Sequence, residues 1–377
     1  MKRALLERIF REAVADCHAG KLVRGLPRLP FDVLACGKAA REMADSAGGN
    51  ELVVTPKYGD GAAGHPLPNA RSAAAGRSAL RAAAEAKNPV VLISGGASAL
   101  WCVPAPGLTL TDKIDATRAL LASGVDIHAI NCVRKHLSAI KGGRLAAAVS
   151  ARSLTCLLLS DVLGDDPSVI GSGPCLPDPS TLTEANAIAR AIPSFPSRVL
   201  EFLAREATET PKHLSVSPNV IVIGNHETLR QAAVRAAARA GYAAELVPPA
   251  GDDVAACEAR LAALAPGPLY IGGGEPTVRV RGSGRGGRCQ QLALGMARRI
   301  RGTEKVFLAA GSDGTDGPTE VAGAIVDGTT WDEAERRGLD PARALDENDS
   351  HRVHALLETH VVTGPTGTNL LDLHLLL

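Results

Sequence analysis

The sequence predicts an α/β protein built from two domains. Its 377 residues exceed the ~100 to 200 that one domain usually holds. Apolar residues make up 45% but aromatic residues only 3%, so the cores consist of Ala, Val, Leu and Ile, as in sheets covered by helices. Short β-like runs alternate with Ala-rich stretches, which indicates βαβ units and a largely parallel sheet. Because Thr208–Pro218 is proline-containing and lacks apolar periodicity, we expect domains 1–212 and 213–377.

The strands and helices follow one another along most of the chain. Nearly every strand candidate ends in Gly, Ser or Asp, and ligands of open α/β sheets bind outside the carboxyl ends of the strands. The expected strands are Phe31–Cys36, Glu51–Thr55, Val90–Ser94, Thr155–Ser160, Asn219–Gly224, Ala243–Val247, Leu269–Gly272, Thr277–Arg281, Lys305–Ala310 and His360–Thr363. The expected helices are Arg71–Lys87, Asp112–Ala122, Gly143–Ala151, Thr183–Ala191, Glu227–Ala240, Asp252–Leu264 and Gly287–Arg301.

Charge and cysteine content exclude several classes of protein. Forty-one basic and 40 acidic residues give a net charge of +1, so no bulk field attracts nucleic acid or a membrane surface. The eight cysteines form no CxxC pair, which argues against a zinc site or a disulfide framework. Met1–Asp16 places apolar residues at helical spacing, and no run reaches the ~18 apolar residues of a membrane span. We therefore expect a soluble cytoplasmic protein.

The run VVLISGGASAL, Val90–Leu100, predicts an anion-binding turn. Ser94–Ser98 follows a buried strand with small residues, whose backbone N–H groups stay accessible at a helix start. The serine-hydrolase pattern G-x-S-x-G lacks its last glycine here, and a turn that merely needs glycines is the plain alternative. Lys38 follows Gly37 and another buried strand, so its ammonium is expected at the same sheet edge.

A second glycine-rich turn precedes the helix Gly287–Arg301. Gly282, Gly284 and Gly287 match the dinucleotide-binding pattern G-x-G-x-x-G, and Asp313 follows the next expected strand. A hydride-transfer enzyme therefore remains an alternative. Arg285 and Arg288 instead suggest a ligand with more concentrated negative charge, because the guanidinium fork suits a carboxylate or a terminal phosphate.

Two acidic loops predict a metal site. Asp313, Asp316 and Glu320 lie within eight residues of one another, and such carboxylates repel unless a cation stands among them. Mg²⁺ is the cation that this oxygen chemistry suits, and a solvated acidic turn is the alternative. The loop after Ser160 repeats the pattern with Asp161 and Asp165.

The densest basic segment is NCVRKHLSAIKGGRLA. It contains Arg134 and Lys141, which are candidates for ligand contact, although charged runs are more often solvated faces. Asn225 follows another strand and is by default a helix cap.

Nine ordered motifs resemble one family. They are GKAA, GHPLPN, ISGGASAL, VRKHLSAIKGGRLA, LSDVLGDDPSVIGSGPCLPDPST, GGGEPTV, GGRCQQLAL, GSDGTDGPTEVAGA and TGPTGTNLLDL. Together, from Phe31 to Asp372, the chain resembles the class II glycerate kinases, or glycerate 2-kinases with a C-terminal MOFRL domain. The resemblance implies an N-terminal Rossmann-like, three-layer domain with a parallel sheet, a smaller C-terminal α/β domain with a mixed sheet, and an active site in the cleft between them.

The resemblance also implies phosphorylation of D-glycerate by ATP with Mg²⁺. We expect 2-phosphoglycerate as the product, and a homodimer is one open assembly. Without a GxxxxGK[ST] run, the ATP phosphates need other turns, such as Gly272–Gly274, Gly282–Gly287 or Gly364–Gly367. An NAD(P)H-dependent hydroxypyruvate reductase and a catalytically silent anion-binding homologue remain alternatives. The chain carries Ala97, Cys289 and Glu320 where the family commonly has Gly, Asn and Asp, so a changed substrate preference is also open.

The resemblance and the motifs together give a set of candidate site residues. Lys38, Arg288 and Asp161 are expected to be catalytic. Asp313, Asp316 and Asp165 are expected to hold the metal. Substrate and phosphate contacts are expected from Ser94, Gly95, Gly96, Ser98, Arg134, Lys141, Asn225, Glu275 and Arg285.

Overall fold

The computed structural model of the chain describes residues 2–24, 31–57, 62–65 and 67–377. Met1 of the expected N-terminal helical segment and Pro66 of the GHPLPN motif lie outside the described residues. Contacts divide the chain into two compact units, Ala19–Ile223 and Met1–His18 with Gly224–Leu377. We call them the N-terminal and the C-terminal unit. The expected limits 1–212 and 213–377 differ from this division, chiefly because the first helix packs within the C-terminal unit.

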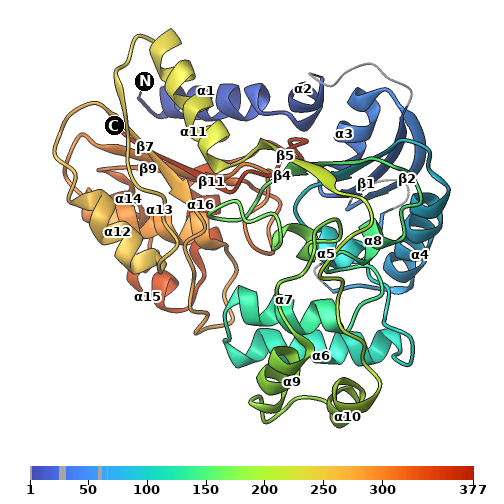
Figure 1. The fold of residues 1–377 in the computed structure, drawn as a ribbon. Coiled ribbons are helices and arrows are strands. Elements are labelled where there is room, and N and C mark those ends of the chain that lie inside the picture. The colour runs from blue at the N-terminus through green and yellow to red at the C-terminus, as the bar shows by residue number, and fades with distance from the viewer. Residues whose placement is uncertain (1, 25–30, 58–61, 66) are drawn as a thin grey trace. The chain divides into compact units, whose positions relative to one another are not determined.

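The N-terminal unit is built on a five-stranded sheet of order β2-β1-β3-β4-β5, shown in Figure 1. The pairings β1–β2, β1–β3 and β3–β4 are parallel, as expected. Its strands are β1 (Asp32–Gly37), β2 (Asn50–Pro56), β3 (Pro89–Ile93), β4 (Leu154–Leu159) and β5 (Pro218–Gly224). Its helices are α2 (Ala19–Val23), α3 (Ala40–Ala47), α4 (Ala70–Glu85), α5 (Ala97–Leu100), α6 (Leu110–Ser123), α7 (Ile127–His136), α8 (Arg144–Ala147), the 3₁₀ turn η1 (Ile170–Ser172), α9 (Leu182–Arg190) and α10 (Ser197–Arg205).

Two hydrophobic cores stabilise the N-terminal unit. One joins β1, β3 and β4 to α4 through residues such as Leu34, Ile93 and Ala79. The other joins α6, α7, α9 and α10 through residues such as Leu120, Val133 and Phe202, and these four helices gather beside the sheet in Figure 1. Because α6, α7, α9 and α10 share this second core, they form a separate helical layer.

The C-terminal unit carries a mixed six-stranded sheet of order β10-β9-β8-β11-β7-β6. β6 and β7 pair in parallel, and the other described pairings are antiparallel. Its strands are β6 (Ala244–Leu246), β7 (Leu269–Gly274), β8 (Val306–Gly311), β9 (Gly323–Asp327), β10 (His360–Val361) and β11 (Asp372–Leu376). Its helices are α1 (Lys2–Asp16), α11 (His226–Arg239), α12 (Val254–Ala262), α13 (Arg288–Arg299), α14 (Thr330–Arg336), α15 (Pro341–Asp346) and α16 (Ser350–Leu357).

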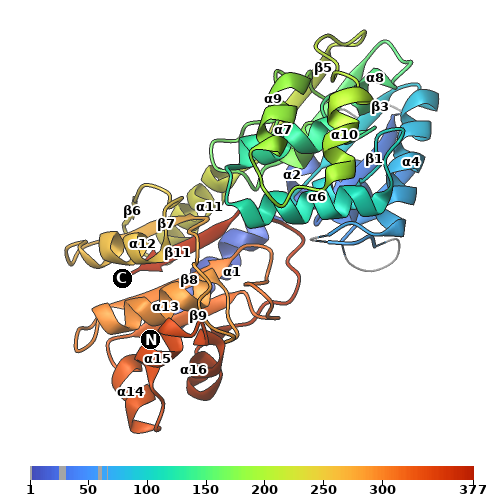
Figure 2. The same cartoon turned by 90° about the horizontal axis from the view of Figure 1, so that it is seen from below.

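Helices pack against the mixed sheet and cover its core. α13 runs along β8 and β9, as Figure 2 shows, and its Leu292 and Met296 share a core with Phe307 and Val326. α1 and α11 contact each other; α1 also contacts β8 and β9, and α11 contacts β6, β7 and β11. The fold class expected from the sequence, α/β with a parallel sheet followed by a mixed sheet, is therefore confirmed.

The expected strand Thr277–Arg281 is wrong. Thr277 forms an isolated bridge with Asp253, and Val280 is 75% exposed, because the following residues have no partner strand in the sheet. The expected helix Gly143–Ala151 shrinks to α8, which Gly143 begins with a left-handed φ of 81°.

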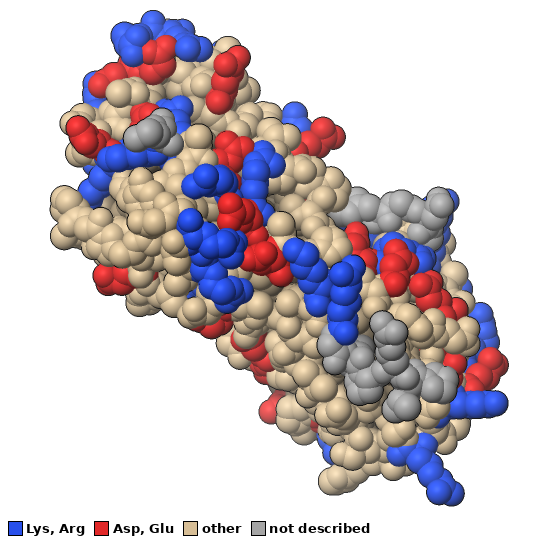
Figure 3. Space-filling model, turned by 90° about the horizontal axis from the view of Figure 1, so that it is seen from above, with Lys and Arg blue, Asp and Glu red and all other residues tan. Residues whose placement is uncertain are grey.

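The surface carries charges of both signs. On the face drawn in Figure 3, basic and acidic side chains are interspersed, which agrees with the net charge of +1. Within the described residues, no helix combines the length and the apolar character needed to cross a bilayer.

Candidate active site

Three predicted residues of the N-terminal unit follow neighbouring strands. Lys38 comes after β1, Ser94 after β3, and Asp161 after β4. These strands run parallel and in register, with Cys36 opposite Ile93 and Ile93 opposite Leu158. The carboxyl ends of parallel strands meet at one edge of a sheet, so the structure brings these three residues to the same edge.

The Ser94–Ser98 turn is tied to the end of β1. The Lys38 N–H donates to the Gly95 carbonyl at 2.8 Å, and the Ala39 N–H donates to Ser94 Oγ at 3.0 Å. A Cβ on Gly37 would lie 2.1 Å from Ser94 Oγ, so only glycine allows this close approach. The Ser94 hydroxyl therefore belongs to the scaffold of the turn.

The second glycine of this turn, Gly96, lies beside the side chains of His65 and Lys38. Gly96 adopts a left-handed φ of 83°, and a Cβ there would lie 3.0 Å from His65 Cδ2 and 3.5 Å from Lys38 Cγ. We name Ser94–Ser98 with Lys38 and His65 the cradle. His65 was not among the predicted site residues, and its signal was the GHPLPN motif.

Lys141 supports the cradle from inside the protein. Its ammonium donates to the carbonyls of Ser98 at 2.7 Å, Trp101 at 3.4 Å and Gly171 at 3.5 Å, and the residue is only 1% exposed. Burial lowers the pKa of Lys141 well below its ordinary value. These contacts give Lys141 a structural role, because its ammonium joins the turn at Ser98 to the turn at Gly171.

The other basic side chains of this segment differ in whether they contact an acidic side chain. Lys135 pairs with Asp178 at 3.0 Å, and His136 Nε2 lies 2.8 Å from Glu209. Arg134, by contrast, is half-buried and forms no hydrogen bond or ion pair with a described residue. Burial lowers its pKa, and the nearby Lys113 has its own pKa lowered to about 8 by burial and by Arg134. Arg134 is thus a cation without a local carboxylate, suited to an anion.

In the C-terminal unit, Arg288 is held by two carboxylates. Nε and Nη2 donate to the two oxygens of Asp372 at 2.5 and 3.0 Å, and Nη1 donates to Glu275 Oε1 at 2.9 Å. Burial opposes the charge of Arg288, but Asp372 and then Glu275 outweigh it and raise its pKa above the ordinary value. The guanidinium therefore stays charged, with its orientation fixed at the start of α13.

Asp372 was missed by the sequence analysis. It is 2% exposed and opens β11, with Gly311 of β8 opposite it on one side and Gly274 of β7 on the other. The sequence feature that could have indicated Asp372 is an acidic residue inside the apolar run LLDLHLLL. A buried carboxylate needs a partner, and here the partner is Arg288.

Asp316 caps α13. Its carboxylate accepts from the backbone N–H groups of Cys289 at 3.0 Å and Gln290 at 2.9 Å, and from Gln290 Nε2 at 2.9 Å. Burial raises its pKa to about 6, against the effect of these donors. Both oxygens are engaged with N–H groups, so this geometry does not fit direct coordination of Mg²⁺.

Asp313 fits a metal better. Its Oδ1 accepts from the N–H and the hydroxyl of Thr315. Gly311 lies beside this oxygen and beside Asp372 Oδ1, since a Cβ on Gly311 would be 3.4 Å from the first and 3.5 Å from the second. Among the described residues, no three His, Cys, Asp or Glu side chains are arranged to hold an ion. Mg²⁺ is commonly bound by one or two carboxylates together with substrate phosphates, and Asp313 meets that requirement.

The glycines of the G-x-G-x-x-G turn are required by packing. A Cβ on Gly284 would lie 2.6 Å from Asp349 Cα, and one on Gly287 would lie 2.2 Å from Asp316 Oδ1. The helix N-terminus where a pyrophosphate would sit is occupied by the Asp316 carboxylate. The structure therefore accounts for this pattern without a dinucleotide.

The remaining predicted residues lie apart from these groups of contacts. Asn225 caps α11 by accepting from the Thr228 N–H at 2.9 Å. Arg285 is exposed and donates to the Pro318 carbonyl at 3.3 Å. Asp165 adopts a left-handed φ of 55° in the turn after β4.

Comparison with known proteins agrees with this architecture. Residues 5–204 match a domain of unknown function, and residues 268–372 match the MOFRL family. The chain is 39% identical to D-glycerate 2-kinase of Thermotoga maritima, over 99% of this chain and 97% of the relative. It is 36% identical to glycerate 2-kinase of Pyrococcus horikoshii, over 89% of this chain and 84% of the relative.

A solved structure shows the same fold. The crystal structure of glycerate kinase from Thermotoga maritima superposes with a TM-score of 0.88 at 35% identity, covering 100% of this chain and 99% of that one. The protein is thus an α/β protein with a C-terminal MOFRL domain. More specifically, the chain belongs to the glycerate 2-kinase family.

Proposed function

We propose that the protein transfers the γ-phosphoryl group of ATP to the 2-hydroxyl of D-glycerate, in the presence of Mg²⁺, giving 2-phosphoglycerate and ADP. The observation that carries this proposal is Arg288, a charged guanidinium held in one orientation by Asp372 and Glu275. Glycerate kinase activity in the relatives supports the same substrate. Phosphoryl transfer needs positioning and charge neutralisation more than covalent catalysis. We propose that two groups of residues supply both: the cradle with Asp161 in the N-terminal unit, and Arg288 with Asp313 in the C-terminal unit.

Each group of residues has a part in this reaction. Three of the five N–H groups of Arg288 are engaged, which leaves two for the glycerate carboxylate or the travelling phosphoryl group. Lys38 balances negative charge that develops on the phosphoryl oxygens. Asp161 orients the 2-hydroxyl and accepts its proton as the new O–P bond forms and the bond to ADP breaks.

Asp313 is the proposed protein ligand of Mg²⁺, which would neutralise phosphate charge when bound. Since Lys38 and Asp161 belong to one unit and Arg288 and Asp313 to the other, the proposal requires both units to act on one substrate. The cytoplasmic location and the homodimer stay predictions.

The test is product analysis. Purified protein with D-glycerate, ATP and Mg²⁺ should release ADP, and phosphorus NMR should show the 2-phosphate rather than the 3-phosphate. Consumption of NADH with hydroxypyruvate, without ADP release, would overturn the proposal in favour of a reductase. Silence in both assays, with thermal stabilisation by glycerate, would favour a binding protein.

Replacing Arg288 tests the residue on which the proposal rests. Arg288→Ala should cost about 2–4 kcal/mol of transition-state stabilisation, measured as kcat/KM, because the group faces transferring charge. Arg279→Ala is the matched control, since Arg279 is an exposed arginine of the same unit outside the predicted site residues, and its kcat/KM should stay within about threefold of wild type. Equal kcat/KM in Arg288→Ala and wild type would remove Arg288 from the site.

A further inference from the structure

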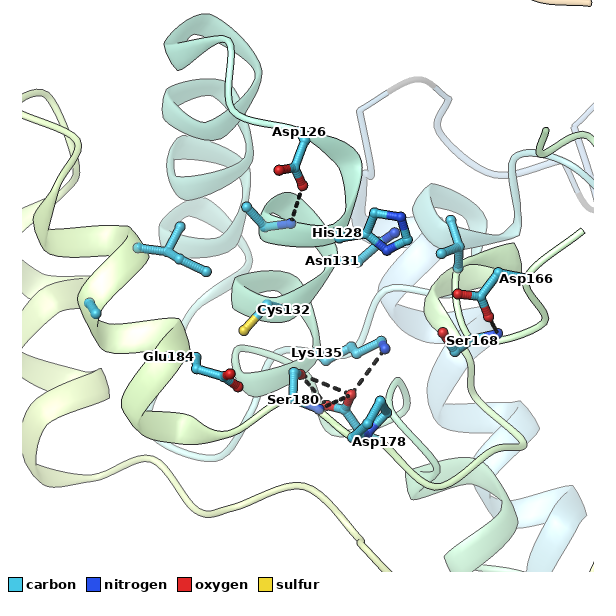
Figure 4. Close-up of a pocket in the computed structure, with 15 residues that line it drawn as sticks. Asp126, His128, Asn131, Cys132, Lys135, Asp166, Ser168, Asp178, Ser180 and Glu184 are labelled. Atoms are coloured by element: carbon cyan, nitrogen blue, oxygen red, sulfur yellow. Dashed lines mark hydrogen bonds and ion pairs between the residues drawn. The ribbon is translucent and has the colours of Figure 1, made fainter. Parts of the chain in front are cut away.

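A cavity of about 570 Å³ lies inside the N-terminal unit (Figure 4). It is bounded by α7, by α9, by the loop 166–169 after β4 and by the loop 178–180. Its volume falls within the ~300–1,000 Å³ typical of small-molecule sites. None of the residues that line it is among the predicted site residues, so it is a separate feature to explain.

The polar wall of the cavity presents acceptors. Asp126, Asp166 and Glu184 each use one oxygen to cap a helix or turn, accepting from Ala129, Ser168 and Thr181 respectively. The second oxygen of each carboxylate bonds to no described residue. Lys135, the buried cation of the lining, is neutralised by Asp178 at 3.0 Å. The wall is therefore negative, which disfavours phosphate and favours a ligand rich in O–H groups.

One donor stands among these acceptors. Asn131 lines the cavity and is only 4% exposed; its Oδ1 accepts from Ser172, whereas its Nδ2 bonds to no described residue. This amide nitrogen is not sealed from solvent, so a ligand acceptor in the cavity can take its N–H groups. Ser172 in turn lies 2.7 Å from the Ser98 hydroxyl of the cradle. The cavity and the cradle are thus joined by two hydrogen bonds.

Apolar side chains line the cavity beside the polar ones. They belong to Ala129, Val169, Pro179, Ala187 and Ile188. Aliphatic side chains of this kind suit a flat, uncharged ring.

We propose that this cavity binds the nucleoside part of the phosphoryl donor. The two free ribose hydroxyls donate to second oxygens of these carboxylates, a base nitrogen accepts from Asn131 Nδ2, and the base lies against the aliphatic side chains. The phosphates stay outside the negative cavity and extend toward the cradle, where Lys38 and the backbone N–H groups lie. This inference rests on the proposed kinase function for the identity of the ligand.

The experiment fills the cavity from its exposed edge. Ala187 is exposed on α9 and lines the cavity, so Ala187→Trp adds bulk to the cavity without disturbing a core. The variant should raise KM for ATP at least tenfold and change KM for glycerate less than twofold. Ala122→Trp is the matched control, an exposed alanine on α6 outside the cavity, and should behave as wild type. Asp166→Asn, which keeps the capping oxygen, should raise KM for ATP about threefold or more.

Adenosine provides a readout that does not need catalysis. It should compete with ATP in the kinase assay and bind wild type in isothermal titration calorimetry, but not Ala187→Trp. If kinase activity is present and Ala187→Trp keeps the wild-type KM for ATP, the cavity inference is wrong and the function stands. If no phosphoryl transfer occurs, the proposed function fails; adenosine binding that Ala187→Trp abolishes would still support the cavity, and no binding would overturn it.

Discussion

Arg288 acts through its partner as much as through its own charge. Asp372 fixes two N–H groups of the guanidinium from a buried position, whereas Glu275 is about half exposed and fixes one. Pairs with exposed partners contribute little, so Asp372 is the group that positions Arg288.

This arrangement predicts a strong effect of Asp372→Asn. The amide keeps the shape of the side chain but removes its charge, so kcat/KM should fall at least tenfold, and Glu275→Gln should cost less. Millimolar guanidinium should partly restore activity to Arg288→Ala but not to the double variant Arg288→Ala/Asp372→Asn. A purely structural Asp372 would leave that rescue intact.

Three buried or half-buried histidines with lowered pKa values predict acid sensitivity. Burial lowers the pKa of His374 to about 4, of His360 to about 4 and of His354 to about 3. Because these folded-state values lie below the unfolded value of ~6.5, the stability they provide is full above pH 6.5 and is lost as pH falls toward 4. For His374 the loss at pH 5 is roughly 2 kcal/mol.

Urea unfolding of wild type and His374→Leu at several pH values measures this loss. The variant should lose less free energy of unfolding between pH 7 and 5 than wild type. Asp316, whose raised pKa acts with the opposite sign over this range, is present in both proteins and cancels in the comparison. Identical pH slopes would contradict the prediction.

At the scale of elements, most strands that end in Gly, Ser or Asp were predictable, although β9, which ends at Asp327, was missed. Strands without such an end were not predictable. Phe31–Cys36 is bounded by Gly37, and β1 lies within one residue of the expectation. LLDLHLLL is apolar almost throughout and has no period of its own, so the central strand β11 was missed. α7 was hidden because its last turn is Arg-Lys-His, whose charges suggested a solvated face, although Lys135 and His136 are buried.

The candidate site divides in the same way. That Lys38, Ser94 and Asp161 follow strands could be predicted, since the chemistry of parallel sheet edges depends on local pattern. The pairing of Arg288 with Asp372 and the capping of α13 by Asp316 depend on contacts across 84 and 27 residues, which local pattern does not encode.

β11 also predicts where the C-terminal unit is most sensitive. Leu373 is fully buried and pairs with Gly273 and Ala310 on the two neighbouring strands. Leu373→Ala should lower the free energy of unfolding by about 2–5 kcal/mol, through lost burial and a cavity. Val280→Ala, at a position 75% exposed, should change it by less than ~0.5 kcal/mol. Chemical denaturation compares the two, and similar losses would mean that β11 is not central to stability.

At the scale of the whole molecule, the chain passes between its units twice. α1 is first in sequence, yet it packs on α11, β8 and β9 of the C-terminal unit. Leu6, Ile9 and Phe10 form its buried face, each fully inaccessible to solvent. The N-terminal segment is therefore part of the MOFRL-containing half.

Phe10→Ala tests this membership. The substitution should cost about 3–5 kcal/mol and speed hydrogen exchange in α11, β8 and β9, while exchange in β1, β3 and β4 stays as in wild type. Leu121→Ala, at an exposed position on α6, is the control for the measurement. Faster exchange confined to the parallel sheet would contradict the assignment.

The placement of α1 has a consequence for biosynthesis. The ribosome makes α1 about three hundred residues before β9, the last of the elements that α1 contacts. At ~5–20 residues per second this amounts to roughly 15–60 s during which Leu6, Ile9 and Phe10 lack their complete native surface. The apolar face of α1 therefore stays uncovered in the nascent chain, where a chaperone can bind it, until β9 is translated and α1 can pack.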